Sequence, residues 1–249
     1  KNKEASMFKK VVLFLSACVM VLPLSAKEPN FGTYQGSAVI EDLNTSNKEI
    51  FGSFAQEELP PCSTFKILNS LIALHTKVVK DENETIPWDG KVRTYDVWNK
   101  DHSMRSAIAV SAVWFYQELA RRIGEKTMQE MVFQSNYGNH NTYHTLTDFW
   151  LGKGSLKISA LQQVDFLSRL MRNQLLFSQK TMATVKEIMI LEQNSGYTLL
   201  GKTGSCGGVG WFVGSVQTPQ NTNAFAFVLK GENVSGAEAK RIAIEYLLH

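Results

Sequence analysis

The chain has 249 residues, of which 44% are hydrophobic and 20% are charged, and its formal net charge is +3 at pH 7. These proportions are ordinary for a globular protein and exclude the collagen-like, coiled-coil and intrinsically disordered classes. Neither the charge nor any basic run of residues points to a nucleic-acid partner.

The first 26 residues predict a cleavable signal peptide. Two lysines form a basic start, an almost unbroken apolar run covers 11–24, and small residues close the segment at Ala26. The apolar run is shorter than the roughly 20 residues that a membrane span needs, so we expect no stable membrane span. We therefore predict a secreted or periplasmic protein whose mature part is 27–249.

Two details of this leader bear on processing. Met7 is the expected natural start, so 1–6 are expected to be upstream residues. Cys18 closes a lipobox-like stretch, which leaves a lipid anchor as an alternative. Removal of the leader takes away four lysines and one glutamate, and the net charge of the mature part is then close to zero.

Strand patterns occur at both ends of the mature chain. Side chains alternate over 36–40, and a turn at 44–47 followed by 49–51 predicts a hairpin. Three further strands are predicted near the C-terminus, at 197–201, 210–216 and 224–229.

Helices are predicted between these two strand regions. The first opens near Ser63, where apolar residues recur at helical spacing, and the second covers 111–123 and ends at Gly124. The polar stretch 81–97 is predicted to be a loop. The remaining helices are predicted at 125–133, 159–171, 178–192 and about 237–247.

The order of these elements predicts the fold class α/β (α+β). An antiparallel sheet built from both chain ends would be flanked by helices, with a mostly helical insertion at roughly 81–190. Residues 27–249 would form a single catalytic domain with its cleft between the sheet and the helical part.

Four short motifs carry candidate chemistry. In Ser63-Thr64-Phe65-Lys66 the serine and lysine share one helix face, as a nucleophile and its base require. Ser111-Ala112-Val113 adds a second hydroxyl at a helix start, and Lys202-Thr203-Gly204 places a cation and a hydroxyl where they suit a substrate carboxylate. Each motif is weak alone, because serine is common at helix starts and Tyr137-Gly138-Asn139 is also a plain turn.

Taken together and in this order, the four motifs resemble the signature set of the class D (oxacillinase-type) serine β-lactamases. The flanking stretches 61–67, 149–151 and 210–214 are similar to that family as well, and the resemblance covers nearly all of 27–249. It implies a serine β-lactamase/penicillin-binding transpeptidase-like fold. It also implies hydrolysis of β-lactam antibiotics (penicillins and oxacillin-like substrates) through a serine acyl-enzyme, and hence β-lactam resistance.

The resemblance implies a role for each catalytic residue. Ser63 would be the nucleophile, Lys66 the general base and Ser111 a proton relay. In this family the lysine is carbamylated by carbon dioxide or bicarbonate to N6-carboxylysine, and the resemblance implies no other cofactor and no metal. The modification is physically coherent, because only neutral lysine reacts with carbon dioxide and an apolar pocket favours the neutral form.

The other implied roles belong to the walls of the cleft. The backbone N–H groups of Ser63 and Ser205 would form the oxyanion hole. The substrate carboxylate would be bound by Lys202, Thr203, Gly204 and Arg241, with Lys240 as the alternative to Arg241. Val113 and Trp150 would hold the carbamate, and Tyr137 and Asn139 would shape the cleft wall.

Three departures from the family pattern lie near these motifs. Cys62 stands where alanine is frequent, the turn at 152–155 is one residue longer than expected, and the stretch 204–211 is short. The last two border the predicted cleft, so they leave the substrate spectrum, including carbapenems, open.

Other candidate residues receive structural interpretations. Cys62 and Cys206 are expected to be unpaired small hydrophobic residues, although export permits a disulfide. His140 and His144 lie four apart in a predicted loop and are not expected to bind a metal. Trp88, Trp98 and Trp114 are expected in the core or the cleft wall.

Two alternative functions share the same motifs. A penicillin-sensing binding domain is acylated without turnover, and a penicillin-binding D,D-peptidase acts on cell-wall peptides. Val113 and Trp150 favour the β-lactamase, which differs from both alternatives in its fast deacylation. Either a monomer or a homodimer is compatible with the sequence.

Overall fold

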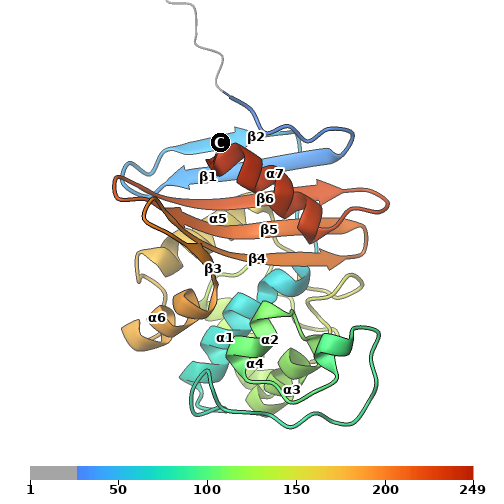
Figure 1. Ribbon diagram of the computed structural model, residues 1–249. Helices are drawn as coiled ribbons and strands as arrows, with labels where there is room; N and C mark the ends of the chain where they lie inside the picture. Colours follow the sequence, from blue (N-terminus) through green and yellow to red (C-terminus); the bar gives the residue numbers. More distant parts are fainter. Residues whose placement is uncertain (1–26, 249) are drawn as a thin grey trace, which may run out of the picture.

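The computed structural model describes residues 27–248 and contains a six-stranded antiparallel sheet (Figure 1). The predicted signal peptide and the alternative lipid anchor at Cys18 lie outside the described residues. The strand order is β2-β1-β6-β5-β4-β3. The strands are β1 (Gln35–Asp42), β2 (Lys48–Phe51), β3 (Ile190–Gln193), β4 (Thr198–Cys206), β5 (Val209–Gln217) and β6 (Thr222–Lys230).

Both ends of the chain contribute to this sheet, as predicted. The N-terminal hairpin joins the C-terminal strands through β1 and β6, in a register that pairs Ala38 with Phe227. β4, β5 and β6 follow one another as an antiparallel meander. The predicted antiparallel sheet and the mixed fold class are therefore confirmed.

Helices cover both faces of the sheet and extend beyond its β4 side (Figure 1). α7 packs against β5 on one face, and α5 packs against β6 and β1 on the other. In residues 27–248 no helix combines the length and the apolar character needed to cross a membrane. The helices are α1 (Lys66–His75), α2 (Met104–Ala109), α3 (Val113–Ile123), α4 (Glu125–Gln134), α5 (Ala160–Met171), α6 (Gln179–Ile188) and α7 (Gly236–Leu248).

The core is divided by the sheet into two apolar layers. Successive residues of β5 alternate between them, so that Trp211 joins the layer under the helical part and Phe212 joins the layer under α7. Almost all of β5 is buried because both faces are covered, which explains its near-continuous apolar sequence. Each large side chain buried in this way contributes about 1.5–3 kcal/mol to stability.

Two helix predictions differ from the structure. The helix predicted at 178–192 ends at Ile188, and the residues after it form the short edge strand β3. Ile190 pairs there with Leu200, so strand pairing overrides the helical pattern. The short helix α2 was not predicted, although Ser103 caps it through a capping box with Ser106.

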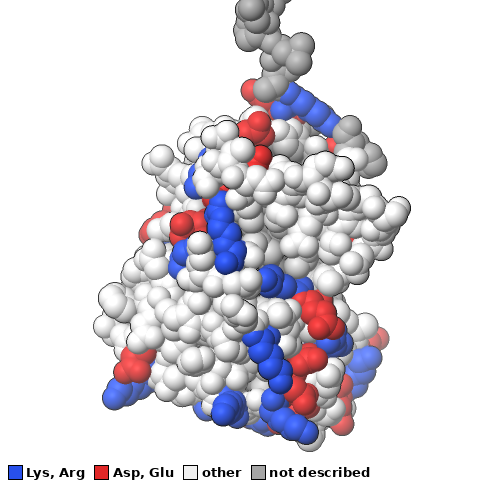
Figure 2. All heavy atoms as spheres, turned by 90° about the vertical axis from the view of Figure 1, so that its left-hand side faces the viewer, with Lys and Arg blue, Asp and Glu red and all other residues white. Residues whose placement is uncertain are grey.

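Charges of both signs are distributed over the face shown in Figure 2. Basic and acidic side chains are interspersed there, and no broad area of one sign is visible on that face. This mixed distribution does not create a strong local field on that side of the molecule.

Candidate active site

The first predicted pair, Ser63 and Lys66, lies where a short 3-10 turn (Cys62–Phe65) leads into α1. The Lys66 Nζ atom lies 2.7 Å from Ser63 Oγ, within hydrogen-bond distance. Lys66 is completely buried. The structure therefore brings a serine hydroxyl and a buried amine into the contact that a nucleophile and its base require.

The surroundings of Lys66 favour its neutral form. Burial, and to a smaller degree the positive charge of Lys202, lower the pKa of Lys66 well below its usual value. No carboxylate among residues 27–248 counteracts this lowering of the pKa, so the neutral form of the amine is favoured.

Lys202 and Ser111 form a second contact from distant parts of the chain. Lys202 lies on β4, and its Nζ donates to Ser111 Oγ at 3.1 Å and to the Thr203 carbonyl at 3.0 Å. Burial and then the charge of Lys240 lower the pKa of Lys202 to about 8. Ser111 occupies the turn between α2 and α3 with φ 57°, rather than the first position of α3 as predicted.

A cavity of about 270 Å³ opens beside these residues. Of the predicted site residues, it is lined by Ser63, Ser111, Val113, Thr203, Gly204 and Ser205. Tyr95, Val97, Trp98 and Val110 complete the lining as an apolar wall. Trp98 was expected in the core or cleft wall, whereas the other three come from segments without a sequence signal.

Gly204 allows β4 to pass close to the nucleophile. A Cβ atom at this position would lie 3.2 Å from the Ser63 backbone nitrogen and 3.0 Å from the Pro61 carbonyl oxygen. These distances are at the limit of contact, so a larger residue would push β4 away from Ser63. The next residue, Ser205, accepts a hydrogen bond from the Gly236 N–H at 2.7 Å through its hydroxyl.

Trp150 holds an unused hydrogen-bond donor in the core. Its side chain is completely buried and stacks on Phe65 with ring centres 5.3 Å apart. The indole Nε1 atom is buried and has no hydrogen-bond partner among the described residues. A buried donor without a partner destabilises the fold. The Trp150 indole N–H is therefore suited to donate a hydrogen bond to an acceptor group that is added to the protein after folding. Val113 lies partly buried at the start of α3.

Arg241 is not brought into the cleft, and its position does not support the predicted role. The exposed guanidinium pairs with Glu238 and Glu245 on the outer face of α7. Lys240 faces the site instead, because it lies four residues after Gly236, which rests against the backbone of Gly204. Its charge acts on Lys202, as the lowered pKa of Lys202 shows.

Tyr137 and Asn139 do not line the cavity. Tyr137 is completely buried and packs edge-on against Phe65 and Phe166. The exposed Asn139 donates from its side chain to the Ser155 carbonyl and accepts from the Lys157 N–H. This motif therefore supports the aromatic core and anchors the neighbouring loop behind the cleft.

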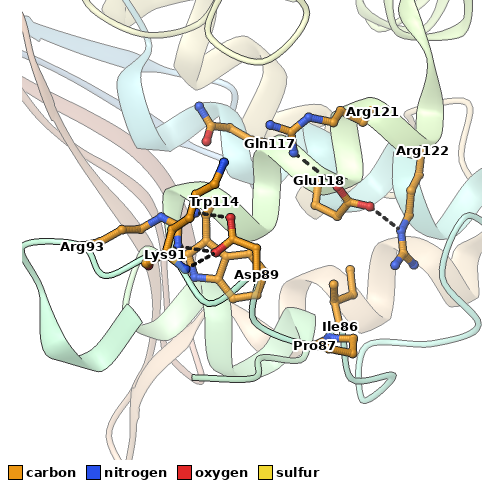
Figure 3. Close-up of a pocket in the computed structure, with 10 residues that line it drawn as sticks. All are labelled: Ile86, Pro87, Asp89, Lys91, Arg93, Trp114, Gln117, Glu118, Arg121 and Arg122. Atoms are coloured by element: carbon orange, nitrogen blue, oxygen red, sulfur yellow. Dashed lines mark hydrogen bonds and ion pairs between the residues drawn. The ribbon is translucent and has the colours of Figure 1, made fainter. Parts of the chain in front are cut away.

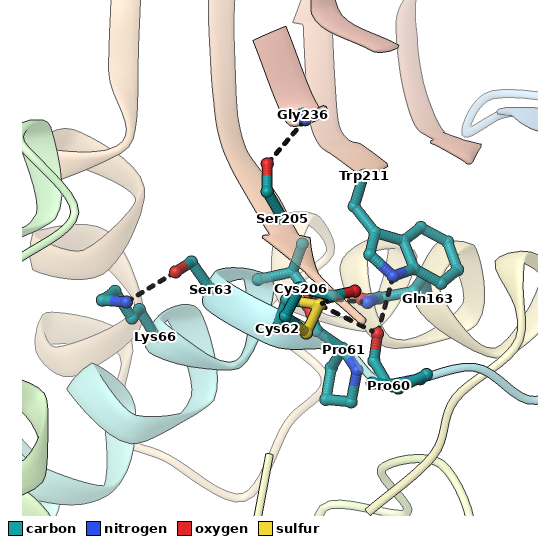
Figure 4. Close-up of a disulfide and its surroundings, with 11 residues drawn as sticks. Pro60, Pro61, Cys62, Ser63, Lys66, Gln163, Ser205, Cys206, Trp211 and Gly236 are labelled. Atoms are coloured by element: carbon teal, nitrogen blue, oxygen red, sulfur yellow. Dashed lines mark hydrogen bonds between the residues drawn. A yellow bond between two sulfur atoms is a disulfide. The ribbon is translucent and has the colours of Figure 1, made fainter. Parts of the chain in front are cut away.

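Cys62 and Cys206 form a disulfide, with Cα atoms 5.7 Å apart (Figure 4). The expectation that they are unpaired is wrong. The two cysteines are 144 residues apart in sequence, but β4 ends beside the turn that carries Ser63. Figure 4 shows both Ser63 and Ser205 close to the disulfide.

A second hollow, of about 340 Å³, lies between α3 and the loop that precedes α2 (Figure 3). Arg93 pairs there with Asp89, and Arg121 and Arg122 share Glu118, so the lining carries more basic than acidic side chains. It contains none of the predicted site residues.

The histidines considered as a metal pair have other partners. His140 Nε2 bonds Asn136, and His144 Nδ1 bonds Asp148. In the part of the chain that the structure describes, no three His, Cys, Asp or Glu side chains gather in a way that could hold a metal ion.

Comparisons with known proteins agree with this geometry. The family model for the penicillin binding protein transpeptidase domain matches residues 34–247. The probable β-lactamase YbxI of Bacillus subtilis is 38% identical over 224 residues (88% of this chain, 82% of the relative), and the β-lactamase OXA-48 of Klebsiella pneumoniae is 37% identical over 229 residues (86% of each). The solved structure of the class D β-lactamase BAT-2 superposes with a TM-score of 0.86 at 37% identity, covering 91% of this chain and 96% of the other. With its transpeptidase-like fold, the chain belongs to the class D β-lactamases, and it is a hydrolase of β-lactams.

Proposed function

We propose that the enzyme opens the β-lactam ring through an acyl-enzyme on Ser63. The observation that carries this proposal is the contact between the buried Lys66 amine and Ser63 Oγ at 2.7 Å. The Lys66 side chain, in the carbamylated form described below, would accept the hydroxyl proton while Ser63 Oγ attacks the lactam carbonyl carbon. The lactam C–N bond then breaks, and the ring nitrogen takes up a proton.

Ser111 is the group that delivers this proton in our proposal. Its hydroxyl lines the cavity and accepts a hydrogen bond from the buried Lys202. A hydroxyl held in this way can pass a proton to the leaving nitrogen and be reprotonated by its lysine neighbour. The backbone N–H groups of Ser63 and Ser205 stabilise the negative charge on the carbonyl oxygen.

The second half of the reaction needs a base that activates water. We propose that, before substrate binds, neutral Lys66 combines with carbon dioxide, with loss of one proton, to give N6-carboxylysine; its carboxylate would accept the proton of Ser63 in the first half of the reaction and a proton of the attacking water in the second. The residues present fit this group: Lys66 has the required neutral character, and the unpaired Trp150 Nε1 offers a donor. Val113, which is partly buried at the cavity edge, helps exclude water.

The substrate carboxylate is bound, in this proposal, at the β4 side of the cleft. Lys202 and Thr203 are joined there by Lys240 rather than by Arg241. Lys202, with its pKa of about 8, is largely cationic at pH 7, and charge-assisted hydrogen bonds to a carboxylate are about twice as strong as neutral ones. The apolar wall of Tyr95, Val97 and Trp98 suits the hydrophobic side chains of oxacillin-like penicillins.

The wider biological role follows from this chemistry as a proposal. An exported enzyme, with residues 1–26 as the cleaved leader, destroys β-lactams before they reach their targets and so confers resistance. It acts as a monomer or homodimer on a small-molecule substrate.

The test is turnover of the chromogenic cephalosporin nitrocefin by residues 27–249, with and without added bicarbonate. We expect many turnovers per enzyme, a rise with bicarbonate, and loss of at least 10³-fold in Ser63→Ala and Lys66→Ala. A single stoichiometric burst that stops, with the label on Ser63, would mean a penicillin-sensing domain or a D,D-peptidase-like acceptor. Undiminished turnover in Ser63→Ala would exclude the proposed nucleophile.

A further inference from the structure

We propose that the Cys62–Cys206 disulfide is a positioning element of the oxyanion hole. This inference depends on the proposed roles of the Ser63 and Ser205 backbone N–H groups. Cys62 directly precedes Ser63, and Cys206 directly follows Ser205. The disulfide therefore links the two backbone segments that would hold the developing oxyanion, and each of its cysteines is the direct neighbour of a proposed donor residue (Figure 4).

The sheet itself does not hold these two segments together. β3 pairs with β4 only as far as Leu200, so the later part of β4 has no strand on the side facing Ser63. Among the described residues that part of β4 is paired on one side alone, with β5. The 3-10 turn that carries Ser63 lies along this open side, where Gly204 approaches the Ser63 nitrogen. The disulfide is the covalent bond that joins this turn to the end of β4.

The backbone conformation of Cys62 connects the disulfide to the direction of the Ser63 N–H group. Cys62 has φ 52°, in the left-handed region, which costs a non-glycine residue roughly 1–2 kcal/mol. The peptide that carries the Ser63 nitrogen follows directly, so its direction depends on this strained residue. Apart from the disulfide, Cys62 is held by a hydrogen bond from its N–H to the Trp150 carbonyl at 3.0 Å.

Cys206, at the other end of the disulfide, is followed by two glycines. Cys206 is the last residue of β4, and Gly207 and Gly208 follow with φ 57° and 75°. Two glycines give the turn wide conformational freedom, so Ser205 is held by its pairing with Gly210 on β5 and by the disulfide rather than by the turn. The disulfide restrains the backbone at Cys206, the residue next to the proposed donor Ser205.

The size of the effect follows from the precision that an oxyanion hole needs. Loss of one donor costs about 10²–10³ in kcat, and a misplacement of about 1 Å costs up to 10². Removing the crosslink loosens both donors and removes neither. We therefore expect a fall of about 10–100-fold in kcat, with KM within about threefold, because the ground-state carbonyl uses these donors less than the transition state.

The experiment compares Cys62→Ser, Cys206→Ser and the double variant with the wild type, at a temperature where circular dichroism shows all four folded. Nitrocefin gives kcat and KM, and a boronic acid that bonds the nucleophilic serine reports on the oxyanion hole as a transition-state analogue. We expect both single variants and the double variant to lose kcat and boronate affinity by the same 10–100-fold. Wild-type enzyme reduced with a phosphine until two thiols titrate should show the same loss and recover it on reoxidation.

Two results would overturn the proposal. If the double variant melts earlier but keeps wild-type kcat and boronate affinity, the disulfide only stabilises the fold. If the loss is confined to variants of Cys62, packing of that buried side chain is responsible and the crosslink is not. Wild-type enzyme without nitrocefin turnover would instead refute the proposed function, so the two failures are distinguishable.

Discussion

Replacement of Lys240, compared with that of its neighbour Arg241, separates two candidates for the substrate carboxylate. Lys240 is partly buried on the side of α7 that faces β4, and its charge contributes to the lowered pKa of Lys202. Arg241 is exposed and is occupied by Glu238 and Glu245. We predict that Lys240→Ala lowers kcat/KM for a penicillin and that Arg241→Ala changes it less than twofold.

The magnitude can be estimated from the kind of interaction that is lost. A hydrogen bond to a charged group contributes about 1.5–3 kcal/mol, and partial exposure of Lys240 places it near the lower end. About 1.5 kcal/mol corresponds to roughly a tenfold fall in kcat/KM. Lys202 remains in place, which limits the loss.

The assay is steady-state hydrolysis of benzylpenicillin by both alanine variants and by Lys240→Arg, which keeps the charge. A second signature comes from pH, because Lys240→Ala removes one of the two causes that lower the pKa of Lys202. The alkaline fall in kcat/KM should therefore move to higher pH in this variant alone. A tenfold loss in Arg241→Ala with normal activity in Lys240→Ala would refute the reasoning.

Three further predictions follow from individual side chains. The pKa of Lys202 is lowered to about 8, so the cation that binds the substrate carboxylate is present below pH 8. The value of kcat/KM should therefore fall as the pH rises through about 8, and a flat profile from pH 7 to 9 would contradict this. Trp150→Phe keeps an aromatic ring beside Phe65 but removes the unpaired indole donor. We expect the stimulation by bicarbonate to disappear and deacylation, measured by stopped-flow, to slow by about 10–100-fold. An unchanged bicarbonate response would count against a role of Trp150 in holding the carbamate. Tyr137→Phe removes a buried hydroxyl that lies beside Thr64 and Gln163, so kcat/KM should stay within twofold while the melting temperature falls by a few degrees at most. A tenfold loss of activity would restore Tyr137 to the cleft wall.

Several parts of the molecule could be predicted from local patterns. The hairpin at the N-terminus and the meander at the C-terminus follow from alternation and turn residues, and these patterns depend on neighbours within a few positions. The contact of Ser63 with Lys66 follows from spacing on one helix face. The family resemblance placed Ser111 and Lys202 in the same cleft, and the structure adds the hydrogen bond between them.

The features that could not be predicted are those that only tertiary structure determines. Whether Lys240 or Arg241 faces the cleft depends on the rotation of α7 about its axis, which is set where Gly236 rests on the Gly204 backbone. The disulfide depends on two segments 144 residues apart. The wall residue Tyr95 comes from a loop without periodicity, so no sequence pattern marks it as part of the cleft.

The central claim is that Ser63 is acylated and then released by a base at Lys66. The most direct measurement is intact-protein mass spectrometry of wild-type and Lys66→Ala enzyme mixed with excess benzylpenicillin, with peptide mapping of any adduct. Our account predicts that the wild type returns to its unmodified mass once the penicillin is consumed, while Lys66→Ala acylates slowly and any adduct on Ser63 persists. An adduct that persists in the wild type, or one that maps to another residue, would contradict it.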